Sequence, residues 1–123
     1  KGESMLVKYR KDYEKIAMGL LSFLPELRDY DQLASAIKFS LDKNYQIYLW
    51  KDTEDNHFIG IIVIEVGEKY VLVRHLSFTP TDRSGKNVYA LLTAIHEQYQ
   101  DCRLMGTLKT QPLISNWERN NEK

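Results

Sequence analysis

The 123 residues leave room for one hydrophobic core, and we expect the chain to fold unaided. Seventeen basic and seventeen acidic side chains balance, so no net charge attracts nucleic acid or an anionic membrane surface, and we expect neither as a partner. The single Cys102 cannot close an internal disulfide, and no apolar run reaches the roughly 18 residues that span a bilayer, which favours a cytoplasmic location.

Residues 1–4 precede Met5 and lack the apolar segment of a signal peptide, so we interpret them as a cloning remnant. We expect one domain over residues 5–123. Residues 5–10 alternate apolar and basic side chains, which indicates a half-buried strand. Apolar residues then recur at helical spacing until Pro25 stops the pattern.

A second helix follows, capped by Asp29 or Asp31 and running to about Lys43. Aromatic and β-branched residues then predict strands separated by polar turns. The expected ranges are 45–51, 58–66 and 69–78 for an antiparallel meander, 81–87 for a polar loop, 88–99 for a helix, 102–108 for a strand and 110–117 for a last helix. The order β-α-α-β-β-β-α-β-α predicts an α/β (α+β) fold with a mixed, mostly antiparallel sheet flanked by helices.

The stretch from Arg74 to Leu92 carries the most informative pattern. A strand ends at Thr79-Pro80, and Arg83, a polar loop and an amphipathic helix follow it. A tight loop between a strand and a helix aims free backbone N–H groups at one point, where the helix dipole adds positive potential. The pattern therefore indicates a site for a phosphate or pyrophosphate group.

This motif and the order of the elements resemble the GCN5-related N-acetyltransferases. More narrowly, residues 9–11, 14–23, 49–51 and 74–77 are similar to acetyltransferase-like proteins encoded among riboflavin-biosynthesis genes in Gram-positive bacteria. The resemblance implies acetyl-CoA or coenzyme A as the cofactor, a small-molecule amine as acceptor, and no metal ion. The implied contacts are the strand backbone at Leu76, Ser77 and Phe78 for pantetheine, and Arg83, Ser84, Gly85, Lys86 and Asn87 for pyrophosphate. Val88 and Tyr89 belong to the implied cofactor site as well.

The phosphate loop departs from the family pattern of Arg or Gln, two residues, Gly, one residue, then Gly or Ala. Counted from Arg83, the two small-residue positions hold Lys86 and Val88, and Gly85 lies one place early. Lys86 can replace backbone contacts by donating its ammonium group to the phosphate. The alternative is a solvated turn before a core helix, with no ligand.

Glu65 and His75 lie on neighbouring predicted strands and are the candidate bases for deprotonating an amine. Each also has a structural interpretation, as a strand-end charge and as a hydrogen-bonded half-buried side chain. The family's usual acid is a Tyr early in the last helix, and counting assigns that place to Trp117, whose indole cannot donate a proton usefully. Thr110 either touches the coenzyme or caps the last helix.

Two functions therefore stay open. One is an acetyl-CoA-dependent N-acetyltransferase linked to riboflavin metabolism, and the other is a catalytically impaired acyl-CoA-binding or regulatory protein of the same fold. The chain ends about where the family adds a final strand pair, so we expect a C-terminally truncated fold. Its pocket would be open or completed by a second copy in a homodimer.

Overall fold

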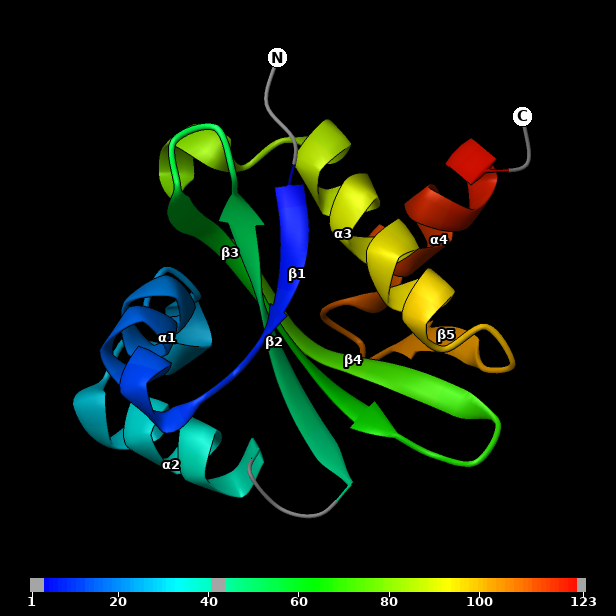
Figure 1. Ribbon diagram of the computed structural model, residues 1–123. Coiled ribbons are helices and arrows are strands. Elements are labelled where there is room, and N and C mark those ends of the chain that lie inside the picture. The colour runs from blue at the N-terminus through cyan, green and yellow to red at the C-terminus, as the bar shows by residue number, and fades with distance from the viewer. Residues whose placement is uncertain (1–3, 41–43, 122–123) are drawn as a thin grey trace.

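The computed structural model describes residues 4–40 and 44–121, and all its strands belong to one sheet in the order β1-β2-β3-β4-β5 (Figure 1). Strands β1 to β4 pair antiparallel with their sequence neighbours, and β5 pairs parallel with β4. The elements are β1 (Ser4–Lys8), α1 (Glu14–Leu21), α2 (Tyr30–Ser40), β2 (Tyr45–Asp52), β3 (His57–Val66), β4 (Tyr70–Phe78), α3 (Gly85–Gln98), β5 (Arg103–Gly106) and α4 (Gln111–Asn121). This confirms the predicted mixed, mostly antiparallel sheet and the predicted order of elements.

Most bounds differ from the predicted ones by one to three residues, and one difference affects the site. Helix α3 begins at Gly85, three residues before the predicted start. The cause is Ser84, whose hydroxyl accepts a hydrogen bond from the Asn87 backbone N–H at 3.2 Å and so caps the helix. The segment 85–87 is therefore the first turn of a helix and not part of a loop. The predicted end of α2 at Lys43 lies outside the described residues.

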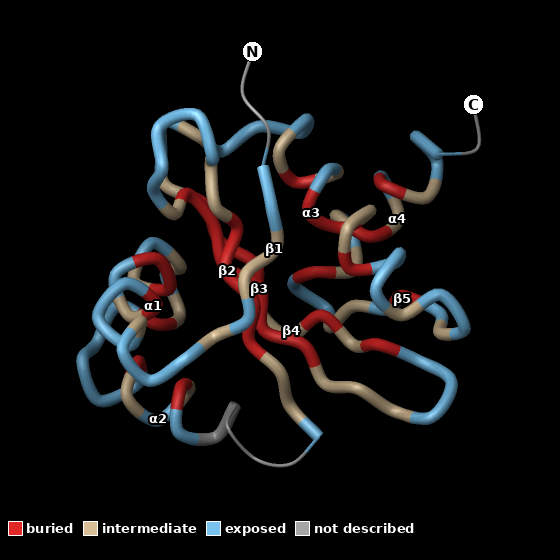
Figure 2. The backbone as a smooth tube through the Cα atoms, viewed as in Figure 1, coloured by how far each residue is buried: buried red, intermediate tan, exposed pale blue. Residues whose placement is uncertain are grey.

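The helices cover the two faces of the sheet in pairs, with α1 and α2 on one face and α3 and α4 on the other (Figure 1). Alternate residues of β3 serve the two cores, with Ile62 and Ile64 toward α3 and α4, and Ile61 and Val63 toward α1 and α2. Figure 2 shows the buried residues gathered along the central strands and on the helix faces that meet them. We call the two faces of the sheet, each with its helices, the α1–α2 face and the α3–α4 face.

Strand β4 carries two irregularities. Val63 pairs with His75 but the next residue, Ile64, pairs with Val73, so Arg74 is an extra residue that forms a β-bulge. Pairing with β5 covers only residues 70–73 of β4. Among the described residues, the stretch 74–78 therefore has a strand partner on its β3 side alone, and its other edge is open.

Candidate functional site

The open edge of β4 offers the backbone groups of Leu76 and Phe78. The Thr79 N–H donates to the Ile59 carbonyl at 3.0 Å, and the same register pairs Ser77 with Ile61. In an antiparallel ladder alternate residues turn their backbone groups to the same side, so Ser77 faces β3. Its hydroxyl is also engaged, because it donates to the Leu20 carbonyl at 2.7 Å. Of the three residues expected to pair with pantetheine, the structure leaves the Leu76 backbone and the Phe78 N–H open. The Phe78 carbonyl accepts from Arg83 Nη2 at 3.4 Å, and Ser77 is occupied.

A cleft of about 270 Å³ lies along this open edge. Its walls come from the loop after α1, the end of β4, the start of α3 and the first turn of α4. The lining residues are Phe23, Leu24, Pro25, Leu76, Ser77, Phe78, Arg83, Val88 and Leu113. Apolar walls beside free backbone N–H and C=O groups suit an extended ligand that alternates alkyl and amide groups. We call this space the apolar cleft.

The start of α3 closes one end of the apolar cleft. The backbone N–H groups of Asn87 and Val88 donate to the hydroxyl and carbonyl of Ser84, which leaves Gly85 and Lys86 as the first-turn donors without an intrahelical partner. Arg83 reaches back to the Phe78 carbonyl, with its Nη2 at 3.4 Å. Together with the helix dipole, these groups form a cationic end suited to a phosphate group.

Three further residues of the expected cofactor site have structural roles. The Asn87 side chain donates to the Asp82 carbonyl at 2.7 Å, which fixes the turn before α3. Val88 is buried in the core of the α3–α4 face, and its amide is held by Ser84. Tyr89 is half-buried and packs against the same core. The Val88 amide is therefore unavailable to a phosphate, because α3 starts earlier than the sequence pattern suggested.

Lys86 lies at a different cavity from Arg83. This second space, of about 520 Å³, is bordered by Lys86, Asn87 and the carboxylate side chains of Asp52, Glu54 and Asp82. We call it the charged cavity. The structure therefore does not bring Lys86 to the cleft that Arg83 lines. The carboxylates of the charged cavity would also repel a phosphate group.

His75 directly follows the bulge in β4 and is in register with Val63 of the α1–α2 core. It is half-buried, and its Nδ1 atom is buried without a hydrogen-bond partner. Burial lowers the pKa of His75, the Glu26 carboxylate opposes that shift, and Arg74 adds to it. The imidazole is therefore neutral near pH 7 and able to accept a proton.

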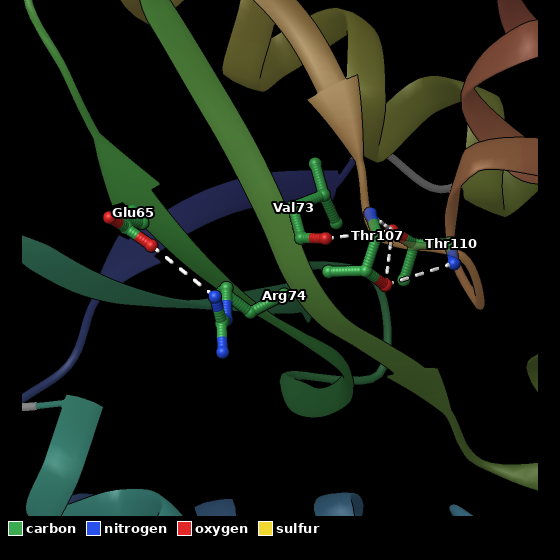
Figure 3. A network of polar contacts seen from close by, with 5 residues as sticks. All are labelled: Glu65, Val73, Arg74, Thr107 and Thr110. Atoms are coloured by element: carbon green, nitrogen blue, oxygen red, sulfur yellow. Dashed lines mark hydrogen bonds and ion pairs between the residues drawn. The ribbon is translucent and has the colours of Figure 1, made fainter.

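Glu65, the other candidate base, is already paired. Arg74 Nη1 lies 3.4 Å from Glu65 Oε1 (Figure 3). The same guanidinium lies over the Tyr45 ring, 5.8 Å from its centroid. The carboxylate that acts on His75 is instead Glu26, in the short 3-10 turn Pro25–Leu27. Sequence reasoning missed Glu26 because the turn after α1 approaches β4 only through the tertiary fold.

The residue of α4 that lines the apolar cleft is Leu113, one turn before Trp117. Trp117 is buried in the α3–α4 core, where its indole Nε1 donates to Thr93 Oγ1 at 3.0 Å. Trp117, to which counting assigns the acid position, is therefore not among the residues that line the apolar cleft. Neither Trp117 nor Leu113 is an acid, so neither supplies a proton donor.

Within residues 4–40 and 44–121, no group of three or more His, Cys, Asp or Glu side chains is arranged to hold a metal ion. In the same part of the chain, no helix combines the length and the apolar character needed to cross a bilayer.

No protein-family model matches the chain. Several solved structures share its fold. An aminoglycoside N-acetyltransferase, AAC(6')-Iy in complex with CoA, superposes with a TM-score of 0.72 over 98% of this chain and 87% of its own, at 13% identity. An aminoglycoside 6'-N-acetyltransferase from Acinetobacter baumannii gives 0.68 over 97% and 88%, at 10% identity. A GNAT-family acetyltransferase from Staphylococcus aureus gives 0.64 over 85% of each chain, at 16% identity.

These structures establish the fold, and a sequence relative establishes the family. An uncharacterised N-acetyltransferase of Bacillus methanolicus, named for its place in the 3' region of lysA, is 36% identical over 116 residues. The match covers 93% of this chain and 95% of the relative. With that identity over nearly the whole length of both proteins, and with the fold they share, the chain belongs to the GCN5-related N-acetyltransferase family.

Proposed function

We propose that the protein transfers the acetyl group of acetyl-CoA to a small amine. The observation that carries the proposal is the open backbone edge of Leu76 and Phe78 beside the apolar cleft. The name of the Bacillus methanolicus relative and the CoA bound to the AAC(6')-Iy structure support it. Acetyl-CoA would supply a thioester, which is the activated form of the acetyl group.

The donor would be held by backbone and charge. Leu76 and Phe78 would pair with the amide groups of the pantetheine arm, and the apolar walls would cover its alkyl parts. Arg83 and the backbone N–H groups of Gly85 and Lys86 would bind the pyrophosphate. Backbone contacts do not depend on side-chain identity, so the departures at Lys86 and Val88 do not remove them.

His75 would act as the base. A neutral imidazole on the α1–α2 side of β4 can remove a proton from an ammonium group, and Glu26 would stabilise the imidazolium that forms. The described residue of α4 that lines the cleft is Leu113, which is not an acid. The departing sulfur would therefore take its proton from solvent. Glu65 would act structurally, by holding Arg74 in the bulge.

The missing acid supports a second candidate, an acyl-CoA-binding or regulatory protein that does not turn over. For either candidate we propose action in the cytoplasm in connection with riboflavin metabolism, on the support of the sequence similarity described above and of the single thiol, Cys102.

A homodimer is a further part of this proposal. In the described sheet β5 is an end strand with a free edge, Met105 on it is 42% exposed, and Leu108 just after it is 98% exposed. A second copy pairing along this edge would cover both apolar side chains. Sedimentation measured against protein concentration tests the dimer, and a monomer throughout the micromolar range would contradict it.

Two measurements on the same preparation separate the candidate functions. Calorimetry with coenzyme A tests binding, and release of free thiol from acetyl-CoA over a panel of small amines tests transfer. Binding with amine-dependent thiol release supports the enzyme, and binding without release supports the second candidate. If the wild type shows no heat and no melting-temperature shift at millimolar coenzyme A, both are wrong.

A further inference from the structure

The ladder between β4 and β5 ends in an unusual way. Arg103 N donates to the Lys69 carbonyl at 3.0 Å, and in a parallel ladder alternate residues of one strand donate to alternate carbonyls of the other. Continued along the strands, this pattern would make Thr107 N donate to the Val73 carbonyl. The structure has a different contact at that position.

The Thr110 hydroxyl is inserted between these two groups (Figure 3). Thr107 N donates to Thr110 Oγ1 at 2.9 Å, and Thr110 Oγ1 donates to the Val73 carbonyl at 2.7 Å. One hydroxyl therefore satisfies both the donor and the acceptor that would otherwise bond directly. Because two hydrogen bonds now span the space of one, the strands must separate at this point.

The start of α4 holds the inserted hydroxyl in place. Gly106 N donates to Gln111 Oε1 at 2.8 Å, and Gln111 Nε2 donates to Ser115 Oγ at 3.0 Å. A Cβ atom at Gly106 would lie 2.6 Å from Gln111 N and 2.7 Å from Thr110 Oγ1. The helix therefore starts directly against the end of β5, and glycine is required there by this close approach.

The β-bulge at Arg74 begins at the residue after Val73, and the open edge follows it. Thr110 is 6% exposed, so water does not compete with its hydroxyl for the Thr107 N–H and the Val73 carbonyl. We propose that Thr110 is a positioning residue that stops the β4–β5 ladder at Val73 and so keeps the Leu76 backbone and the Phe78 N–H free to pair with coenzyme A. This inference rests on the proposed coenzyme binding, and it makes one side chain responsible for keeping the edge of β4 open.

The test compares Thr110→Val, which keeps the shape and removes the hydroxyl, with Thr110→Ser, which keeps the hydroxyl. Calorimetry with coenzyme A should show Kd raised about tenfold or more in Thr110→Val, the loss expected when a buried hydrogen-bonded group is removed, and near wild type in Thr110→Ser. Ile47→Ala truncates the core of the α1–α2 face, far from this contact, and controls for a general loss of stability. Its Kd should equal that of the wild type.

A second readout needs no ligand. Backbone amide exchange at Leu76 and Phe78 should be fast in the wild type and in Thr110→Ser, because these groups face an open edge. It should slow in Thr110→Val if Thr107 and Val73 now bond directly and the ladder closes. If Thr110→Val does not fold, Gln111→Leu releases the Gly106 amide from α4 and should raise Kd in the same direction by a smaller factor.

The outcomes are distinct. Unchanged Kd and unchanged exchange in folded Thr110→Val, or in Gln111→Leu if that variant alone folds, would overturn the positioning role while leaving the proposed function intact. A wild type that does not bind coenzyme A would overturn the proposed function, and the positioning role with it. Thr110→Ser behaving like Thr110→Val would show that the methyl group and packing matter, not the hydroxyl, and would also overturn the inference.

Discussion

The start of α3 separates two cavities that differ in almost every physical property. The charged cavity is the larger, at about 520 Å³ against 270 Å³ for the apolar cleft, and it holds Lys86 among three carboxylates. The apolar cleft holds Arg83, mostly apolar walls and a strand edge with free backbone groups. The phosphate-loop residues are thus divided between the two spaces, although they are adjacent in sequence.

Size is therefore a poor guide to the coenzyme site here. A pyrophosphate brought into the charged cavity would meet Asp52, Glu54 and Asp82, whose negative charges oppose it. In the apolar cleft it would meet the Arg83 guanidinium. The difference teaches that side-chain charge and unpaired backbone, more than volume, distinguish the two candidate sites.

The largest expected effect tests whether chemistry occurs beside the apolar cleft. Replacing His75 by Gln removes the proposed base while keeping a polar side chain, so kcat should fall about 10²- to 10⁴-fold, the usual contribution of a general base. Thiol release measured at saturating acetyl-CoA checks this, with the Kd for coenzyme A unchanged as the control. Turnover equal to wild type would exclude His75 as the base.

The next effect compares the two cavities directly. Arg83→Ala should weaken coenzyme A binding by about 1.5–3 kcal/mol, the range for a hydrogen bond to a charged group, and its binding should depend less on salt than that of the wild type. Lys86→Ala is the matched variant and should change binding by less than about 0.5 kcal/mol. Calorimetry at two salt concentrations measures both. A larger loss for Lys86→Ala would move the phosphate to the charged cavity.

A smaller effect separates the core of α4 from its cleft-lining turn. Trp117→Phe loses the hydrogen bond to Thr93 and should lower the free energy of unfolding by about 1 kcal/mol, with turnover nearly unchanged. Chemical denaturation and the thiol assay measure the two quantities. A strong loss of rate at full stability would show that Trp117 shapes the cleft.

The smallest effect concerns pH. Because the folded protein lowers the pKa of His75 below its ordinary value of 6.5, the unfolded chain binds the proton more readily. The stability that this group contributes is present above about pH 6.5 and is lost as the pH falls toward the lower folded pKa. The melting temperature of wild type should therefore drop more than that of His75→Gln across that interval. Parallel curves would contradict the lowered pKa.

Local patterns in the sequence located most of the fold. The spacing of apolar residues placed the helices and strands, since which face of an element is buried depends on a short repeat. The strand end at Thr79-Pro80 followed by Arg83 indicated where a phosphate site would lie, and Arg83 does line the apolar cleft. The cap at Ser84 was overlooked, although a Ser directly before a helical pattern is a recognised start signal.

Contacts between distant segments decided the rest. Leu113 lines the apolar cleft from α4, and the Glu26 carboxylate acts on His75 from the turn after α1. Nothing in the local sequence marks either residue. Lys86 and Arg83 are three residues apart, yet the first turn of α3 directs them to different cavities. No spacing rule separates them, because the division depends on where the helix starts against the sheet.

The sequence by itself determined the order of elements, the mixed sheet and the segment that carries the phosphate motif, because these depend on local periodicity. Only the tertiary structure decided which backbone groups face the cleft. Val71 and Val73 turn their backbone groups toward β5. In an unbroken strand residues 75 and 77 would face the same side, but the bulge at Arg74 shifts the alternation by one residue. Leu76 and Phe78 take the open edge instead, since the bulge is set by pairing with β3 on one side and β5 on the other.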